Sequence, residues 1–388
     1  MLGDRVLPPD PDSAPMSGVV RAALEIAREQ AVMGADVHVV AVGDSCWEAS
    51  WNGVELQQLR RVTYAQLPRV IDYRVHAPLV AMTSKRRFDV VHGHLYSYLR
   101  FLRARLRVIH HHADPVYAGA TQRDATRMRH DAALHVAVSD YVCRRVRELL
   151  GEHCDVLVAH NGSEHAVRNV DPVALREVGR SRYGLSDDDI AFLFSGAIRP
   201  KKGVATLLTS FSALARRDHR AVLLIAGGET LWGAANANRG SSYEDELRAA
   251  CGEDVASRVR WLGKLDPQEM AEAYAACDSV IVPSVWPEPF GLVAVEGMAF
   301  GAHIIASSTG GLAELVDDVV GVLVEPNHTA ALEDALAAFA KDVSQWRTRR
   351  STVAQEAARY SWRSAAREIT DGYLRHLRDT SGPMEDQS

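Results

Sequence analysis

Short apolar runs alternate with helically patterned segments along most of the chain. In 18–33 the apolar residues recur at the spacing of one helix face. Apolar runs typical of buried strands occupy 36–42, 88–91, 106–109 and 134–138. The last run ends at Ser139, a residue suited to cap a helix that runs to Leu150. Strands separated by helices predict parallel βαβ units and therefore a doubly wound α/β sheet.

The alternation stops at a turn signal and then starts again. The signal is Asn161-Gly162, and polar stretches follow it in 163–189. Further strand-like runs occupy 190–194, 221–226, 259–262, 279–282, 304–306 and 322–324. Further helical patterns occupy 204–215, 243–250, 267–276, 330–339 and 361–377. We therefore expect two α/β domains of similar architecture, residues 1–165 and 166–360, with a C-terminal helix at 361–380 completing the first.

The composition is ordinary for a soluble globular protein and excludes several function classes. The 388 residues are 47% hydrophobic and 24% charged, enough for two domains at roughly 150 residues each. A formal net charge of −6 disfavours non-specific nucleic-acid binding, which needs a basic face. No apolar run approaches the ~18 residues of a membrane span, and the N-terminus lacks a secretory layout. The five cysteines form no CxxC pair, which predicts a reduced, cytoplasmic protein without a cysteine-based zinc site.

The segment richest in candidate chemistry is 283–314. There Phe290-Gly291 opens a predicted helix, whose first turn has unpaired N–H groups and the positive end of the helix dipole. Such a helix start can bind an anion such as a phosphate. Glu288 precedes the helix and Glu296 lies in its second turn. A carboxylate accepts two hydrogen bonds at once, so it can grip the vicinal hydroxyls of a ribose. The alternative for either glutamate alone is a solvated surface carboxylate.

A basic loop follows the predicted strand 190–194. Its sequence, SGAIRPKKGV, places Arg199, Lys201 and Lys202 just before a helix. Cations at this point can neutralise a leaving diphosphate. The alternative is a basic loop that contacts only solvent. A second glycine-rich helix start, Gly310-Gly311, follows a later strand.

Histidines gather after two predicted strands of the first half. His92-Gly93-His94 follows one strand and His110-His111-His112 the next, at carboxyl ends where open α/β sheets bind ligands. In an extended segment His110 and His112 point one way and His111 the other. These imidazoles suit a zinc or nickel ion, hydrogen bonds to substrate, or a purely structural role at the end of the sheet. Because Asp114 is the only acidic or cysteine side chain at ligand spacing, the sequence argues against a metal site.

The spacing Glu288-x7-Glu296 resembles the signature of family 4 of the retaining glycosyltransferases, which have the GT-B fold. The resemblance implies two Rossmann-like domains facing each other across a cleft, with the acceptor bound by the first and a nucleotide-sugar donor by the second. It also implies that Glu288 contacts the donor sugar and Glu296 the ribose. The backbone amides expected to hold the sugar and the β-phosphate are those of Phe290, Gly291 and Leu292.

Shorter motifs extend this resemblance over most of the chain. Val138-Ser139 with Asn161-Gly162 is similar to the end of the family's first domain. The segment 195–203 is similar to its diphosphate-binding loop, and 262–264 to the loop that lies against the base. These similarities imply donor contacts from Lys202 and Lys264.

Two positions depart from the family pattern. The arginine that commonly follows the glycine of the diphosphate loop is Ala197 here, and we expect Arg199 to take its place. The first glycine of the turn before the first helix is Ser17, whereas Gly18 remains as a predicted phosphate contact. His112 matches the family's histidine at its strand end. The predicted catalytic residues are therefore His112, Arg199, Lys202 and Glu288, and the candidate acceptor-binding residues are His92, His94, His110 and Asp114.

Together these features predict a retaining glycosyltransferase that needs neither metal nor cofactor. It would move a hexose-type sugar from a nucleotide-diphospho-sugar, with a UDP-sugar favoured, to a hydroxyl of a small molecule or glycan. Bacterial natural-product or polysaccharide biosynthesis is the expected setting. His110-x-His112 and the insertion around 231–242 are similar to the family's spore-coat-type members.

Two other functions remain open on the sequence. One is a non-catalytic sugar-nucleotide-binding or coat-assembly protein on the same fold, which the departure at Ala197 favours. The other is a sugar-nucleotide 2-epimerase, which would isomerise the donor without an acceptor. The donor base, the acceptor and the oligomeric state are not predicted.

Overall fold

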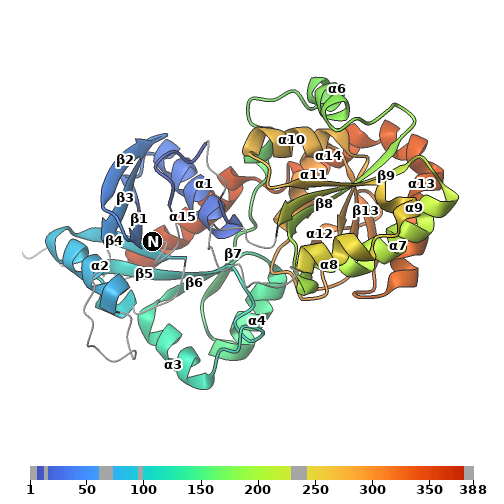
Figure 1. Ribbon diagram of the computed structural model, residues 1–388. Coiled ribbons are helices and arrows are strands. Elements are labelled where there is room, and N and C mark those ends of the chain that lie inside the picture. The colour runs from blue at the N-terminus through green and yellow to red at the C-terminus, as the bar shows by residue number, and fades with distance from the viewer. Residues whose placement is uncertain (1–6, 13–15, 61–72, 95–98, 229–242, 380–388) are drawn as a thin grey trace, which may run out of the picture. The chain divides into compact units, whose positions relative to one another are not determined.

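Two compact units make up the chain in the computed structural model, which describes residues 7–12, 16–60, 73–94, 99–228 and 243–379 (Figure 1). The first unit contains nearly all of the residues up to Asn161 together with those from Trp362 on. The second contains Gly162–Ser361. The insertion 231–242 lies outside the described residues. None of the described helices is long and apolar enough to cross a membrane.

The described residues of the first unit form two sheets. Three strands form one sheet in the order β1-β3-β2, and four parallel strands form the other in the order β4-β5-β6-β7. The strands are β1 (Val37–Gly43), β2 (Trp47–Trp51), β3 (Val54–Arg60), β4 (Phe88–Gly93), β5 (Ala104–His111), β6 (Leu134–Ala137) and β7 (Val156–Val158). The helices are α1 (Gly18–Val32), α2 (Tyr73–Lys85), η1 (Leu99–Phe101), α3 (Gln122–Asp131), α4 (Asp140–Leu150) and α15 (Trp362–Asp379). The predicted cap at Ser139 is confirmed, since its side chain accepts a hydrogen bond from the Val142 N–H.

An antiparallel hairpin, β2–β3, was missing from the sequence-based prediction. Asn52 and Gly53 connect the two strands with φ values of +49° and +81°. Two left-handed residues in succession are typical of the tight turn that joins hairpin strands, and Asn-Gly is its strongest sequence signal. The Asn52-Gly53 dipeptide is therefore the local signal from which this hairpin could have been predicted.

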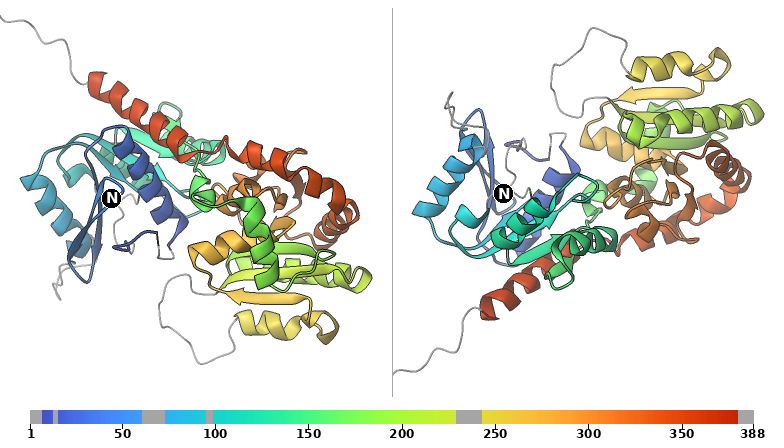
Figure 2. Two further views of the ribbon diagram at one scale, coloured as in Figure 1. Left: turned by 90° about the horizontal axis from the view of Figure 1, so that it is seen from above. Right: turned by 90° about the horizontal axis from the view of Figure 1, so that it is seen from below.

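The C-terminal helix α15 returns to the first unit. It packs against α1 and against β5, β6 and β7, and Figure 2 shows it (red) running alongside α1 (blue). Trp362 at its start is fully buried. At Gly372 an added Cβ would lie 3.2 Å from Leu157 and 3.3 Å from Leu134, so a small residue lets the helix approach the sheet. The helix thereby covers one face of β5–β7.

In the second unit, the described strands form one six-stranded parallel sheet with helices around it. The strand order is β10-β9-β8-β11-β12-β13. The strands are β8 (Ile190–Ala197), β9 (Ala221–Gly228), β10 (Val259–Gly263), β11 (Ser279–Val282), β12 (His303–Ser307) and β13 (Gly321–Val324). The helices are α5 (Glu164–Val167), α6 (Pro172–Arg182), η2 (Pro200–Lys202), α7 (Val204–Arg217), α8 (Tyr243–Ala250), α9 (Glu253–Ala256), α10 (Pro267–Ala276), α11 (Leu292–Ala299), α12 (Leu312–Leu315), α13 (Thr329–Thr348) and α14 (Arg350–Ala357). Numbered from β8, this order is 3-2-1-4-5-6, the order of a doubly wound dinucleotide-binding sheet.

A buried carboxylate ties the helices of this unit to the sheet. Asp278, just before β11, accepts hydrogen bonds from Arg176 (2.5 Å), Arg347 (2.9 Å) and the Ala191 N–H (3.0 Å). Arg180 lies 3.6 Å from the same carboxylate. Burial alone would raise the pKa of Asp278, but the hydrogen bond from Arg347 and the charge of Arg176 outweigh it and lower the pKa. Asp278 therefore stays ionised and links α6 and α13 to β8 and β11.

Candidate functional site

The strand order of the second unit marks a ligand-binding position. From β8 the chain proceeds outward to β9 and β10, and from the adjacent β11 it proceeds the other way, to β12 and β13. In open α/β sheets ligands bind beyond the carboxyl ends of the strands at such a reversal point. The loops that leave β8 and β11 contain the predicted diphosphate loop and the predicted sugar-binding glutamate. The topology therefore brings these two sequence motifs together.

The two loops are in direct contact through glycine. Gly203 has φ +73°, and an added Cβ would lie only 1.8 Å from the carbonyl oxygen of Pro283. The N–H of Val285 also donates to the carbonyl oxygen of Lys201 at 2.9 Å. No side chain larger than hydrogen fits at 203 without separating the loops. The close backbone contact fixes where Lys202 lies relative to the β11 loop.

An ion pair between Lys202 and Glu288 lies at the centre of this position. The Lys202 ammonium donates to Oε1 of Glu288 in a short hydrogen bond. Ser284 Oγ (2.6 Å) and Trp286 Nε1 (3.0 Å) donate to the same oxygen. Glu288 is 7% exposed, and its Oε2 accepts no hydrogen bond from the part of the chain that the structure describes. Three donors thus fix the carboxylate and leave one oxygen for a ligand hydroxyl.

The Gly310-Gly311 pair holds the backbone of Glu288. A Cβ on Gly310 would lie 2.2 Å from the Glu288 carbonyl oxygen, and the Gly311 N–H donates to that oxygen at 2.7 Å. The helix that this pair opens, α12, has only four residues. Close packing beneath the glutamate therefore explains the two glycines better than a binding site at that helix.

The start of α11 has the properties expected of an anion-binding helix end. Gly291 is its N-cap with φ +114°, and no side chain of the described residues caps it. The N–H of Ala294 donates to the Gly291 carbonyl oxygen at 2.9 Å, so the N–H groups that precede it, at Leu292 and Val293, are the ones that suit a bound anion. Phe290, 3% exposed, packs edge-on against Tyr360 with ring centroids 5.9 Å apart. The predicted backbone donors at Phe290, Gly291 and Leu292 all lie at this helix end.

Glu296, half-buried in α11, is oriented by a tyrosine that the sequence did not single out. Tyr274 of α10 donates its hydroxyl to Oε2 of Glu296 at 2.7 Å. Burial, followed by the negative charge of Glu296, raises the pKa of Tyr274 well above its usual value. The phenol therefore stays protonated and donates to the carboxylate. Tyr274 lies 22 residues before Glu296, a separation from which no sequence pattern predicts contact.

The remaining predicted donor-binding residues lie around the same sheet edge or at the start of the first unit. Arg199 is exposed and precedes the turn η2, and Ala197 is the buried last residue of β8. Lys264 is exposed just beyond β10, with its Cε 3.7 Å from a Cβ built on Gly228. Gly18 is exposed as the first residue of α1. Lys202 and Glu288 are the predicted pair that the structure brings into contact.

The histidines of the first unit form a stacked cluster, the imidazole cluster His92, His94, His110 and His112. The ring centroids of His92 and His94 are 4.5 Å apart and those of His110 and His112 are 4.1 Å apart. His111 lies on the other face of β5, with its Nε2 2.9 Å from Nδ1 of His135. The predicted alternation of side chains at 110–112 is therefore confirmed.

Burial keeps the inner rings of this cluster uncharged. Burial first, and then repulsion from neighbouring imidazoles, lowers the pKa of His94 and His110 well below the usual histidine value. Desolvation likewise lowers the pKa of His92. His110 is 2% exposed and His94 is 7% exposed, which leaves little surface for contact with an acceptor. Their predicted acceptor contacts stay predictions.

Asp114 has a structural environment. Its carboxylate accepts from the N–H groups of Val116 (2.8 Å) and Tyr117 (2.9 Å), from Arg145 Nε (2.9 Å) and from the Tyr141 hydroxyl. Burial would raise the pKa of Asp114, but these hydrogen bonds outweigh it and lower the pKa. The four donors account for the burial of Asp114 without a ligand.

Two protein families match consecutive parts of the chain. The family described as "Glycosyltransferase Family 4" matches residues 16–166, and "Glycosyl transferases group 1" matches 176–358. A D-inositol 3-phosphate glycosyltransferase from Nocardia farcinica is 33% identical over 213 residues, which are 53% of this chain and 45% of that relative. An uncharacterised glycosyltransferase from Methanocaldococcus jannaschii is 31% identical over 201 residues, 50% of this chain and 47% of that protein. The chain thus spans about half the length of the curated relatives it matches.

Solved structures resemble the whole described chain. A sucrose-phosphate synthase from Thermosynechococcus elongatus superposes with a TM-score of 0.72 at 21% identity, covering 94% of this chain and 95% of that one. The Anabaena protein HepE, crystallised with UDP and glucose, superposes with a TM-score of 0.74 at 18% identity, covering 96% and 98%. Identities this low show the fold alone. That fold is GT-B, built from two Rossmann-like domains.

Proposed function

The chain belongs to the family 4, group 1 glycosyltransferases, and we propose that it transfers a sugar from a nucleotide-diphospho-sugar to a hydroxyl acceptor. The observation that carries this proposal is the Lys202–Glu288 pair at the strand-order reversal of the second unit. It joins a cation suited to phosphate, a carboxylate suited to sugar hydroxyls and an uncapped helix start. We further propose a hexose-type donor, with a UDP-sugar favoured. The UDP and glucose in the related HepE structure support this choice.

The proposed chemistry depends on stabilising the leaving diphosphate. As the bond between the anomeric carbon and the phosphate oxygen breaks, negative charge grows on the diphosphate. Lys202, Arg199 and the N–H groups at the start of α11 supply positive potential where that charge develops. A bound donor phosphate would compete with Glu288 for the Lys202 ammonium, and Glu288 would then accept from a sugar hydroxyl. We propose that these groups stabilise the diphosphate without a metal ion.

We propose retention of configuration at the anomeric carbon. The acceptor oxygen would bond to that carbon from the face that the diphosphate leaves, and the acceptor proton would pass to the departing phosphate oxygen. The carboxylate of Glu288 is held by three donors at one oxygen, which suits a group that binds hydroxyls better than one that attacks carbon. On the acceptor side, His112, at the half-buried rim of the imidazole cluster, is the proposed contact.

A thermal-shift panel followed by a transfer assay tests the proposal. UDP-, GDP-, ADP- and dTDP-sugars are added separately, because a ligand that binds the native state raises the melting temperature. The nucleotide sugar that raises it most is then incubated with candidate hydroxyl acceptors, and the anomeric configuration of the product is read by NMR. An inverted product would refute the retaining mechanism. No shift with any nucleotide sugar would refute the donor site itself.

A non-catalytic sugar-nucleotide-binding protein is the second candidate. Ala197, buried at the end of β8, occupies the position where the family commonly has an arginine. If the chain only binds, the thermal shift persists while neither donor hydrolysis nor transfer occurs. Transfer that is abolished by Lys202→Met and kept in Lys341→Met, an exposed lysine of α13, would exclude this candidate.

A further inference from the structure

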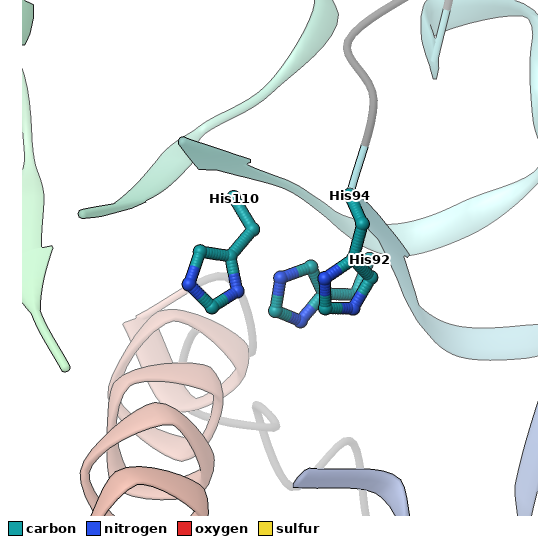
Figure 3. A group of neighbouring side chains, drawn as sticks. All are labelled: His92, His94 and His110. Atoms are coloured by element: carbon teal, nitrogen blue, oxygen red, sulfur yellow. The ribbon is translucent and has the colours of Figure 1, made fainter. Parts of the chain in front are cut away.

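Three histidines of the first unit bring ring nitrogens to one place (Figure 3). His92 lies in β4, His94 follows that strand, and His110 lies in β5. One ligand nitrogen from each ring lies within 4.8 Å of the other two. β4 and β5 are parallel neighbours with Gly93 opposite Ile109. Because alternate residues of a strand share a face, the three side chains extend from the same face of the sheet.

Hydrogen bonds orient two of the three rings. Nδ1 of His92 contacts the Tyr373 hydroxyl, and Nδ1 of His94 lies 2.8 Å from Nε2 of His112. Each of these two rings is thus oriented through Nδ1. Both nitrogens of His110 are buried without a hydrogen-bond partner among the described residues. A buried ring with two unsatisfied nitrogens is costly, and a bound ligand at one of them removes part of that cost.

The donor set of the cluster indicates the class of ligand. The three side chains offer only imidazole nitrogens, and these suit zinc and related transition metals. Asp114, the nearby carboxylate considered from the sequence, is engaged by four donors of its own.

We propose that His92, His94 and His110 bind one divalent transition-metal ion of the zinc class. Three imidazole nitrogens leave a fourth position for water or for an oxygen ligand. Around a tetrahedral ion with bonds of ~2.0–2.1 Å, ligand nitrogens are about 3.3 Å apart, so the rings of His92 and His94, stacked here with an interplanar angle of 8°, must turn toward the ion to close the site. Tyr373 contacts Nδ1 of His92, and His112 contacts Nδ1 of His94. In metal proteins, hydrogen-bond partners of this kind orient the ligating imidazoles. The proposal does not rest on the proposed sugar transfer.

Metal titration of tag-free protein tests the site. The protein is stripped with a chelator, then titrated with Co²⁺, followed by its visible absorption bands, and with Zn²⁺ in competition with a chromophoric chelator. We expect one ion per chain and a higher melting temperature with Zn²⁺. His110→Ala removes a ligand and should weaken Zn²⁺ binding by at least ~100-fold. Tyr373→Phe removes only an orienting contact and should weaken it by about 10-fold.

The matched control is His130→Ala, because His130 is an exposed histidine of the same unit. It should leave stoichiometry and affinity unchanged. Wild-type affinity in His110→Ala, or no saturable Zn²⁺ binding by the wild-type protein, would overturn the proposal. Should His110→Ala fail to fold by circular dichroism, His94→Asn supplies the same comparison. Titrations contain no nucleotide sugar, and donor binding is measured separately on the stripped protein, so a failure here is distinguishable from a failure of the proposed transfer.

Discussion

The two units place different kinds of side chain at the same position of a parallel sheet, charged ones in the second unit and uncharged imidazoles in the first. In both units the chemically distinctive side chains lie at or just beyond the carboxyl ends of parallel strands. The second unit places a lysine and a glutamate there, and they contact each other. The first unit places imidazoles there, and burial lowers their pKa until they are neutral. We propose that this place holds a diphosphate in the second unit, where the side chains are charged, and a metal ion in the first unit, where they are imidazoles.

The comparison also shows how each region accommodates burial. Charged groups in the second unit are buried with partners, as Asp278 is with its arginines. In the imidazole cluster, burial lowers the pKa of His94 and His110, so these two rings lose their protons instead. Both solutions avoid an isolated buried charge, which would cost several kcal/mol.

The largest expected effect comes from removing a buried partner in the second unit. Asp278→Ala leaves the buried Arg180 and the half-buried Arg176 and Arg347 without their carboxylate and should lower the free energy of unfolding by about 3–5 kcal/mol. Urea unfolding followed by tryptophan fluorescence measures the loss. Asp254→Ala is the control, because that pair with Arg216 is exposed and should contribute little to stability. If both variants lowered the free energy of unfolding equally, the buried ion pairs of Asp278 would not contribute more than an exposed pair.

The pKa of Asp278 gives this prediction a pH dependence. Its pKa is lowered in the folded state, so the unfolded chain binds the proton more readily. The stabilisation is therefore complete above the ordinary aspartate range near pH ~3.9 and is lost as the pH falls through the lower folded-state pKa. The difference in unfolding free energy between the wild type and Asp278→Asn should shrink on acidification below pH ~3.9. A difference that grows instead would contradict the sign.

The next effect concerns the charged pair at the proposed donor site. Lys202→Met removes the cation proposed to stabilise the leaving diphosphate and should lower kcat by about 10²–10³-fold, as for loss of one transition-state donor. Steady-state transfer kinetics measure it, with Lys341→Met as the control for loss of a surface charge. Lys202→Arg should recover part of the activity. An unchanged kcat in Lys202→Met would remove the lysine from the mechanism.

A smaller effect on nucleotide binding distinguishes the contribution of Glu296 from that of Tyr274, which orients it. Glu296→Ala should weaken nucleotide binding by a few kcal/mol at most, since charged hydrogen bonds contribute about 1.5–3 kcal/mol. Tyr274→Phe removes only the hydroxyl that donates to Glu296 and should weaken binding by about 1 kcal/mol. Calorimetric titration with the nucleotide measures both. Donor affinity that is unchanged in Glu296→Ala would place Glu296 outside the site.

The last effect, the smallest near neutral pH, arises from buried neutral histidines in both units. Burial lowers the pKa of His135 to about 4 and that of His303 to about 3. Since the unfolded chain binds these protons near pH ~6.5, stability should fall as the pH drops below that value, by at most about 1.4 kcal/mol per pH unit for each histidine. The His303 ring stacks on Phe339, and phenylalanine can take its place there. The variant His303→Phe should therefore show a smaller slope when the free energy of unfolding is plotted against pH. An unchanged slope would show that His303 does not contribute.

Local sequence signals predicted most of the regular structure. The helix capped at Ser139 and the helix over 267–276 both begin where a capping residue is followed by helical spacing, and both are confirmed. The predicted helix at 330–339 is too short, because α13 continues past a kink at Asp342 to Thr348. The helix α6, which follows Asp171-Pro172, was missed inside a polar stretch, although Asp171 caps it and proline is its first residue.

The candidate site divides in the same way. The sequence by itself determined which residue types stand at Lys202, Glu288 and Glu296 and that a helix begins between the two glutamates, because caps, turns and strand periodicity are local. It could not determine that Lys202 touches Glu288, that Tyr274 orients Glu296 or that Gly310 packs beneath Glu288. Nor could it show that His92 and His110 converge from neighbouring strands. Those contacts join residues far apart along the chain, and only strand order and close packing bring them within a few ångströms.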